Sequence, residues 1–282
     1  MEKKAREYQV SVLIPVQIFD NLFEVALESI CQQSLMNIEI LIGCHNFCRQ
    51  EINAFKLKNK SDCRIRVFDC SGMANISEIL NFLIKRSSAP FICRMDADDI
   101  SDRKRLEVQL DYLTSNPDVA LVGSYIRLID SLGKEINPCV SRSRKVDLQL
   151  HKWESQLFHP TFFGRRKIFE SLNGYSENID RAQDYDFVTR ALLANYVIHN
   201  VPEVLLSYRV SQAPEQRQKY LNQLIYQFMV YSIFFRNKAW KTNRLTRLVL
   251  KHPRYYALLY LNVFSPFSRF LWIKWWKKRE II

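Results

Sequence analysis

Three acidic side chains within four positions could together hold a divalent cation. Asp96, Asp98 and Asp99 closely follow a short apolar run at 91–93, which predicts a strand. Two carboxylates at positions i and i+2, on a turn that leaves a strand, can converge on one hard ion. Mg²⁺ or Mn²⁺ bound in this way keeps part of its shell for phosphate and water, so it can offset the charge of a departing diphosphate.

Two competing interpretations apply to this acidic loop. Acidic loops are common and are usually just solvated. A phosphatase motif of the DxDx[TV] type would need Thr or Val where Asp99 and Ile100 stand, and it is therefore disfavoured. The apolar strand before the loop, and a helix predicted after it with Ser101 as its cap and Arg103 onward as its body, favour a binding site.

A second acidic cluster, at 183–187, begins another predicted helix and offers a general base. A carboxylate such as Asp184, in the first turn of a helix, is kept ionised by the positive end of the helix dipole. An ionised carboxylate can accept a proton from an attacking hydroxyl group. The ordinary alternative is an acid that only caps the helix.

The elements that must position these residues alternate along the chain. Apolar, β-branched runs predict strands at 10–16, 38–42, 65–68, 91–93 and 119–122. Helical spacing of apolar residues predicts helices at 22–33, 76–85 and 103–114, the first of them capped by Asp20-Asn21. This alternation implies βαβ units and a mostly parallel sheet, which binds ligands beyond the carboxyl ends of its strands. Loops near residues 15 and 96 fall at such ends.

Composition is that of a globular protein with reduced cysteines. The chain has 282 residues, of which 48% are apolar and 25% charged, so it can bury a full-sized core. Seven cysteines, an odd number without a CxxC pair, fit a cytosolic protein. Cys44, His45 and Cys48 cluster at an unusual spacing for zinc, and a plain loop is the simpler interpretation.

The positive charge is concentrated near the C-terminus. The segment 236–282 holds 12 Lys or Arg and the single acid Glu280, a net charge of +11. Of the 41 basic and 29 acidic residues, 29 and 28 remain for the other 235 positions, a net charge of +1. We therefore expect no nucleic-acid partner, since no RNA-binding motif accompanies the basic segment.

The same basic segment is dense in Trp, Tyr and Phe. These residues favour the headgroup level of a bilayer, and Lys and Arg attract anionic lipid. We expect one or two interfacial helices that bring the protein to a membrane surface; a helical subdomain with a solvated basic face is the alternative. The N-terminus has no apolar signal core and no long uncharged apolar stretch occurs, so a spanning helix is not expected.

An ordered series of motifs over residues 8–212 resembles the family 2 glycosyltransferases, which have the GT-A fold. Each motif is common by itself, but together, in this order and at family spacing, they are specific. The motifs are VSVLIPV at 10–16, SICQQS at 29–34, EILI at 39–42, RMDADD at 94–99, RLEVQ at 105–109, NPD at 116–118, VGS at 122–124, HPT at 159–161, NGY at 173–175, DYD at 184–186 and LLSYR at 205–209.

The resemblance implies an α/β, GT-A domain over 1–212 with a mostly parallel, mixed sheet flanked by helices. A helical, basic and aromatic appendage over 213–282 would associate with the inner face of the membrane, from the cytoplasm. The implied reaction is inverting transfer of a single sugar from a nucleotide sugar, a UDP-sugar by analogy, to a saccharide or lipid-linked acceptor in surface polysaccharide assembly. The QxxRW motif of processive synthases is absent.

The resemblance also assigns residues on the nucleotide side. Pro15 and Val16 would lie along the nucleotide, and Asp96 and Ala97 would contact the nucleotide sugar, Asp96 at the ribose or a metal-bound water. Asp98 would ligate Mn²⁺ or Mg²⁺.

On the acceptor side, Asp184 would be the general base. Arg94 is assigned to the nucleotide sugar as a contact near the phosphate or the acceptor, and His159 and Asp99 to the phosphate or acceptor side.

Departures from the family pattern leave other functions open. The family's acidic VDDGS loop is replaced at 43–47 by Gly-Cys-His-Asn-Phe, where His45 could still hydrogen-bond a nucleobase. A Gln183 stands where the family often has Glu. The alternative is therefore a catalytically impaired nucleotide-sugar-binding or membrane-scaffold protein of the same fold. A sugar nucleotidyltransferase would need a Gly-rich loop after the first strand, and none is present.

Overall fold

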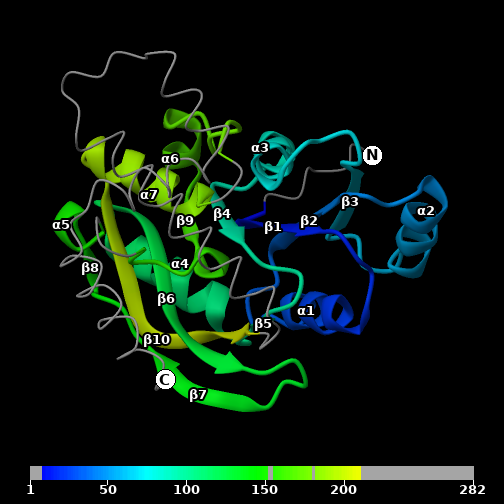
Figure 1. Cartoon of the computed structure of the whole chain (residues 1–282), viewed down its shortest axis with the longest axis horizontal. Coiled ribbons are helices and arrows are strands. Elements are labelled where there is room, and N and C mark those ends of the chain that lie inside the picture. Colours follow the sequence, from blue (N-terminus) through cyan, green and yellow to red (C-terminus); the bar gives the residue numbers. More distant parts are fainter. Residues whose placement is uncertain (1–7, 152–154, 180–181, 211–282) are drawn as a thin grey trace, which may run out of the picture. The chain divides into compact units, whose positions relative to one another are not determined.

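The computed structural model describes residues 8–151, 155–179 and 182–210, and Figure 1 shows their arrangement. Strands and helices alternate through the first half, as the sequence predicts. The strands are β1 Val10–Val16, β2 Ile38–Cys44, β3 Ile65–Asp69, β4 Phe91–Arg94, β5 Ile100–Ser101, β6 Val119–Ile129, β7 Glu135–Val140, β8 Lys145–Val146, β9 Phe163–Arg165 and β10 Val197–Arg209. The helices are α1 Asn21–Cys31, α2 Arg49–Lys58, α3 Ile76–Arg86, α4 Arg105–Ser115, α5 Leu148–His151, α6 Arg166–Ser171 and α7 Gln183–Leu193, with a 3₁₀ turn at His159–Thr161.

The strands form one mixed sheet in the order β3-β2-β1-β4-β9-β6-β10-β5. The ladders β3-β2-β1-β4 and β6-β10 are parallel, whereas β9 and β5 pair antiparallel with their neighbours. The chain moves outward from β1 through β2 to β3 and then returns to place β4 on the other side of β1. This reversal is a topological switch point, so the carboxyl ends of β1 and β4 border a natural ligand crevice.

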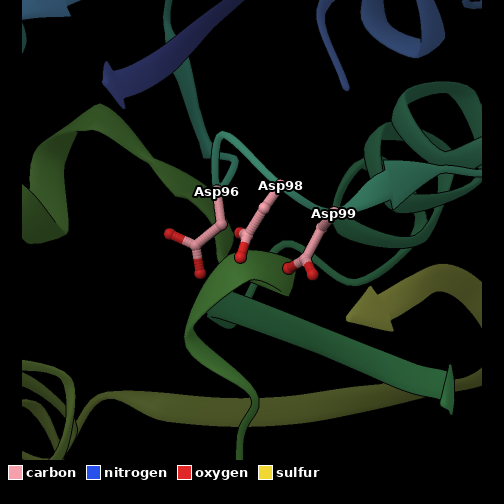
Figure 2. Close-up of side chains that lie close together, drawn as sticks. All are labelled: Asp96, Asp98 and Asp99. Carbon is pink, nitrogen blue, oxygen red and sulfur yellow. The ribbon is translucent and has the colours of Figure 1, made fainter. Parts of the chain in front are cut away.

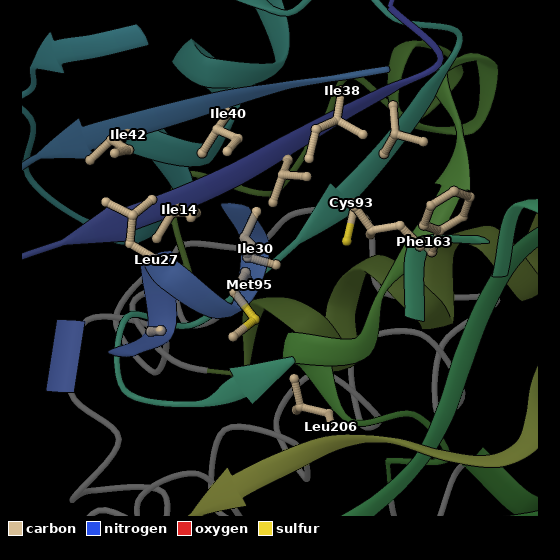
Figure 3. Packing of buried hydrophobic residues seen from close by; sticks show 14 of the residues in the cluster. Ile14, Leu27, Ile30, Ile38, Ile40, Ile42, Cys93, Met95, Phe163 and Leu206 are labelled. Carbon is tan, nitrogen blue, oxygen red and sulfur yellow. The ribbon is translucent and has the colours of Figure 1, made fainter. Parts of the chain in front are cut away.

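Helices cover both faces of the sheet. One core cluster joins alternate residues of β1 and β2 to α1, α2 and α4; Figure 3 shows Ile14, Ile40 and Ile42 packed with Leu27 and Ile30. A second cluster joins the opposite face to α3, α6 and α7 (Figure 1). Because β1 and β2 are buried on both faces, their sequences are apolar runs without alternation.

The predicted cap of the fourth helix is wrong. Ser101 lies in strand β5, where its backbone pairs with Leu206, and α4 begins only at Arg105. The hydroxyl of Ser101 instead lies 3.1 Å from Nε2 of Gln33, so it joins β5 to the end of the first helix region. The predicted cap of α1 is confirmed, because Oδ1 of Asp20 accepts from the backbone N–H of Phe23 at 2.9 Å.

The predicted appendage at 213–282, with its interfacial helices, lies outside the described residues. Within the part of the chain that the structure describes, no helix is long and apolar enough to cross a bilayer.

Candidate active site

The acidic loop lies at the carboxyl end of β4, at the switch point. The side chains of Asp96, Asp98 and Asp99 point to one side of the loop (Figure 2), and one carboxylate oxygen of each lies within 4.8 Å of the others. Asp98 is exposed, whereas Asp99 is 1% exposed and its Oδ1 accepts from the backbone N–H of Arg209 at 2.8 Å. Ala97 is half-buried against the core. The loop thus presents two accessible acids above one buried acid.

The arrangement fits a hard divalent cation. Carboxylate oxygens are the donors that Mg²⁺ and Mn²⁺ prefer. Although part of Asp98 is open to solvent, desolvation by the surrounding loop and the negative charge of Asp96 raise its pKa. Burial with the charges of Asp96 and Asp98 raises the pKa of Asp99 well above its ordinary value. Oδ2 of Asp99 is buried without a hydrogen-bond partner among the described residues. A cation would offset this repulsion. The alternative cluster of Cys44, His45 and Cys48 does not converge in the described structure, where only the three aspartates form such a group.

Arg94, the last residue of β4, is fixed just before the acidic loop. Its N–H donates to the carbonyl of Phe162 at 2.9 Å, and its carbonyl accepts from Nη2 of the fully buried Arg105 at 2.8 Å. Its own guanidinium is buried and pairs through Nη2 with Oδ1 of Asp96. Nε and Nη1 have no hydrogen-bond partner among the described residues. Two buried donors therefore remain for a ligand or water.

Asp184 lies in the first turn of α7, as predicted, but it does not cap the helix, since the capping position is Ala182. Burial raises the pKa of the Asp184 carboxyl, while the N–H of Tyr185 and the charge of Arg94 act in the opposite direction. Asp96 also raises this pKa, so the base candidate and the acidic loop lie within electrostatic range of each other. A buried carboxyl with a raised pKa is a stronger base than a solvated one.

His159 is buried beside a residue that the sequence analysis did not single out. Its Nε2 lies 3.0 Å from the hydroxyl of Tyr175, and burial together with the charge of Arg94 lowers the pKa of His159 well below its ordinary value. His159 is therefore a neutral, buried group. Burial raises the pKa of Tyr175, whose surroundings include Arg94 and Asp184. The NGY motif at 173–175 was the signal that could have identified Tyr175.

The loop that carries Tyr175 is fastened from two helices. Asn81 of α3 accepts from the N–H of Tyr175 at 2.8 Å and donates to its carbonyl at 2.9 Å. From α7, Arg190 donates to the carbonyls of Leu172 and Gly174 at 2.7 and 2.9 Å. Arg190 is itself paired with Asp186, so the second acid of the DYD motif has a structural contact.

The residues predicted for the nucleotide lie at the carboxyl ends of β1 and β2. Pro15 and Val16 end β1, and the carbonyl of Val16 accepts from the N–H of His45 at 2.9 Å. Nδ1 of His45 lies 3.3 Å from the carbonyl of Cys70, which can only accept, so this contact requires a proton on Nδ1. These residues and the acidic loop follow the carboxyl ends of the parallel strands β1, β2 and β4. The turn with His159 leads into β9, the neighbour of β4 on the side away from β1, and α7, which carries Asp184, lies on that side in Figure 1. Their individual roles remain predictions.

Residues 11–172 match the family described as glycosyl transferase family 2, and this match covers more than half of the chain. The chain belongs to glycosyltransferase family 2. Its RMDADD motif runs from the end of β4 toward β5, and its Asp184 lies in the first turn of α7, as the residue pattern predicts.

Two glycosyltransferases from Escherichia coli are similar to this chain over most of its length. The O-antigen biosynthesis glycosyltransferase WbnJ is 27% identical over 211 residues, which are 74% of this chain and 82% of WbnJ. The UDP-Gal:α-D-GlcNAc-diphosphoundecaprenol β-1,3-galactosyltransferase is 24% identical over 234 residues, which are 80% of this chain and 83% of that enzyme.

A solved structure has a similar fold. The mannosyltransferase PcManGT from Pyrobaculum calidifontis, in complex with GDP-Man and Mn²⁺, superimposes with a TM-score of 0.62 at 16% identity. The match covers 89% of this chain and 70% of the mannosyltransferase. This likeness confirms the α/β, GT-A-like fold with its mixed sheet and flanking helices.

Proposed function

We propose that the chain is an inverting, metal-dependent hexosyltransferase. It moves a single sugar from a nucleotide sugar, a UDP-sugar in this proposal, to a hydroxyl of a lipid-linked saccharide during surface polysaccharide assembly. Asp98, with Asp96, would hold Mn²⁺ or Mg²⁺, and Asp184 would be the base.

One observation carries this proposal: Arg94 joins the two acidic groups that the reaction needs. Its guanidinium pairs with Asp96 of the acidic loop, and its charge opposes the burial that raises the pKa of Asp184. A loop suited to a metal–diphosphate and a buried base are therefore both within the electrostatic reach of one fixed cation. The sugar must be bound between them, since its anomeric carbon is joined to the diphosphate and is attacked by the hydroxyl.

Each group has a distinct task in the transfer. Asp184 accepts the proton of the acceptor hydroxyl as that oxygen attacks the anomeric carbon from the face opposite the diphosphate, which inverts the configuration. Arg94, whose Nε and Nη1 have no partner among the described residues, orients an anionic or hydroxyl oxygen near the reacting centre. A divalent cation, when bound, would offset the charge that develops on the departing diphosphate.

The names of the relatives support the choice of substrates. One relative uses UDP-Gal and a sugar linked to diphosphoundecaprenol, and another belongs to O-antigen biosynthesis. A lipid-linked acceptor gives the basic, aromatic segment at 213–282 a purpose: attachment to the cytoplasmic side of a membrane would bring the site to its acceptor.

A donor screen on the purified protein tests the proposal. UDP-, GDP- and dTDP-sugars are offered with Mn²⁺, with and without EDTA, and with membrane lipid extract as acceptor. We expect one donor to turn over, EDTA and Asp98→Ala to abolish turnover, and Asp184→Asn to remove transfer but not nucleotide binding. Asp111→Asn, an exposed acid on α4, is the control and should behave as wild type. If no donor binds or turns over, the proposal is wrong and the non-catalytic scaffold becomes the better interpretation.

A further inference from the structure

Arg209, the last residue of β10, donates hydrogen bonds to two consecutive residues of the acidic loop. Its backbone N–H donates to Oδ1 of Asp99 at 2.8 Å, and its Nε donates to the carbonyl of Asp98 at 2.8 Å. Its Nη1 donates to the carbonyls of Asp130 and Ser131, at 2.8 and 3.1 Å. One side chain therefore connects the acidic loop to the turn that follows β6.

The acidic loop connects two strands of the sheet. The loop leaves β4 at Arg94 and enters β5 at Ile100, and β5 pairs with β10 through Leu206 and Ser207. The contacts of Arg209 extend this pairing one step further, onto Asp99 and Asp98. Because the carbonyl of Asp98 is held by Arg209, the peptide plane beside the exposed carboxylate cannot rotate freely.

The turn beyond β6 gives Arg209 a rigid anchor. Asp130 closes this turn, since its carbonyl accepts from the N–H of Gly133 at 3.0 Å and its Oδ1 accepts from the N–H of Lys134 at 2.8 Å. The side chain of Arg209 donates to three carbonyl oxygens, those of Asp98, Asp130 and Ser131, and this requires several N–H groups in a fixed arrangement. A guanidinium supplies them, whereas an ammonium group supplies one flexible point charge.

We propose that Arg209 is a positioning residue for the metal–diphosphate site, because it sets the direction of the Asp98 carboxylate through the Asp98 carbonyl and Asp99. This inference rests on the proposed function, since it concerns how Asp98 holds a metal–nucleotide complex. Arg209 need not touch the ligand: it acts through the loop.

The test compares Arg209→Met and Arg209→Lys with a matched control. Arg127→Met is the control. Arg127 lies on β6, next to the turn that Arg209 contacts, but it pairs with Glu135 of β7 at 3.1 Å. This ion pair is half-exposed and does not involve the acidic loop. Binding of UDP and of GDP is measured by calorimetry with and without Mn²⁺. Hydrogen exchange of peptides covering 96–101 and 128–134 is measured on the same proteins without any nucleotide.

We expect Arg209→Met to weaken Mn²⁺-dependent nucleotide binding about 10- to 100-fold, as displacement of a site by about 1 Å can do. Arg209→Lys should recover only part of this loss, and Arg127→Met should match wild type. Exchange should rise in both peptides for Arg209→Met and not for Arg127→Met. A lysine variant with wild-type affinity would show that charge alone matters and would overturn the positioning role.

Failure of this inference and failure of the proposed function give different results. If wild type binds nucleotide with Mn²⁺ and Arg209→Met binds it equally well, the inference is wrong and the function stands. If wild type binds neither nucleotide, the proposed function is wrong; faster exchange in Arg209→Met then shows that Arg209 is only a structural tether, which also overturns the inference. Unchanged exchange overturns it in every case. Arg209→Lys keeps the test decisive if the methionine variant does not fold.

Discussion

Nη2 of Arg94 pairs with Oδ1 of Asp96, so the first acid of the loop already has a cationic partner. Among the residues that the structure describes, the exposed carboxylate of Asp98 has no ion-pair partner. The two acids of the motif therefore differ in what they can give to a metal. Asp96 is held and partly neutralised, and Asp98 is free to bind.

Asp98→Asn should abolish metal-dependent nucleotide binding and yet raise the melting temperature of the metal-free protein slightly. The substitution removes a charge that raises the pKa of Asp99 and thus relieves repulsion within the loop. Calorimetry with UDP, with and without Mn²⁺, and a thermal melt in EDTA measure the two effects. Asp96→Asn is the contrast: it leaves buried Arg94 without its partner, so its melting temperature should fall. Equal melting behaviour of the two variants would contradict this division of roles.

The rate of transfer should fall on the acidic side with a midpoint above the ordinary Asp value. Asp184 must be ionised to accept a proton, and burial raises its pKa above the ordinary value of an aspartate. Protonation therefore disables the base at a higher pH than it would in a solvated carboxyl. A profile of kcat against pH measures the midpoint, and Asp184→Asn should lower kcat about 10²- to 10⁴-fold. An unchanged nucleotide Kd in this variant would separate loss of the base from loss of the site, and a profile flat to pH 4 would contradict the assignment.

A buried carboxylate at the opposite end of the sheet should contribute to stability. Glu39 is fully buried and accepts from Ser11 at 2.7 Å, from Ser88 and from Nη1 of Arg66 at 2.6 Å. Burial alone would raise its pKa, but these hydrogen bonds outweigh burial and lower the pKa below 4.5. Glu39→Gln should lower the free energy of unfolding by about 2 kcal/mol near neutral pH.

The stabilisation by Glu39 depends on pH because the pKa of Glu39 is lowered in the folded protein. Because the folded-state pKa of Glu39 is lowered, its stabilisation is present above 4.5 and is lost as the pH falls through the folded value. Urea unfolding at neutral and acidic pH should show the two proteins converging in acid. Glu24→Gln, which removes an exposed ion pair with Lys58, should change stability by no more than about 0.5 kcal/mol. A gap that widens in acid would contradict the assignment.

The sequence predicted best what local pattern determines. The run at 10–16 has no polar alternation, which is the signature of a strand buried on both faces, and its end at Pro15 and Val16 lies at the switch point. Asp20 caps α1 because capping involves neighbours only three residues apart. The position of the acidic loop at 94–99 was also predicted correctly, because it follows directly from the apolar run that forms β4.

What the sequence did not predict depends on partners far apart in the chain. Ser101 has the type of a capping residue, but pairing with Leu206 places it in a strand. Helix α2 was missed because it buries only Ile52 and Phe55, too few for a periodic signal. The contacts of His159 with Tyr175 and of Asp99 with Arg209 exist only in the folded chain. Local propensity carries no information on such pairs.

Gly174→Ala should destabilise the protein and impair transfer, whereas two other glycines provide graded controls. Gly174 has a φ of +69°, and a Cβ there would lie 2.2 Å from Oδ1 of Asn81, the atom that holds the N–H of Tyr175. Gly133 has a φ of +85° but meets only Nη1 of Arg209, at 4.0 Å, and Gly72 has neither constraint.

The left-handed backbone costs an alanine about 1–2 kcal/mol, so Gly133→Ala should lose that much and Gly72→Ala almost nothing. Gly174→Ala should lose more than Gly133→Ala, since the collision adds to the backbone cost, and it should also lower kcat, since the loop shifts Tyr175 and with it His159. Urea unfolding and transfer assays on all three variants measure these losses. Equal losses for the variants at 174 and 133 would mean that Asn81 moves aside without cost, and that it does not fasten the Tyr175 loop.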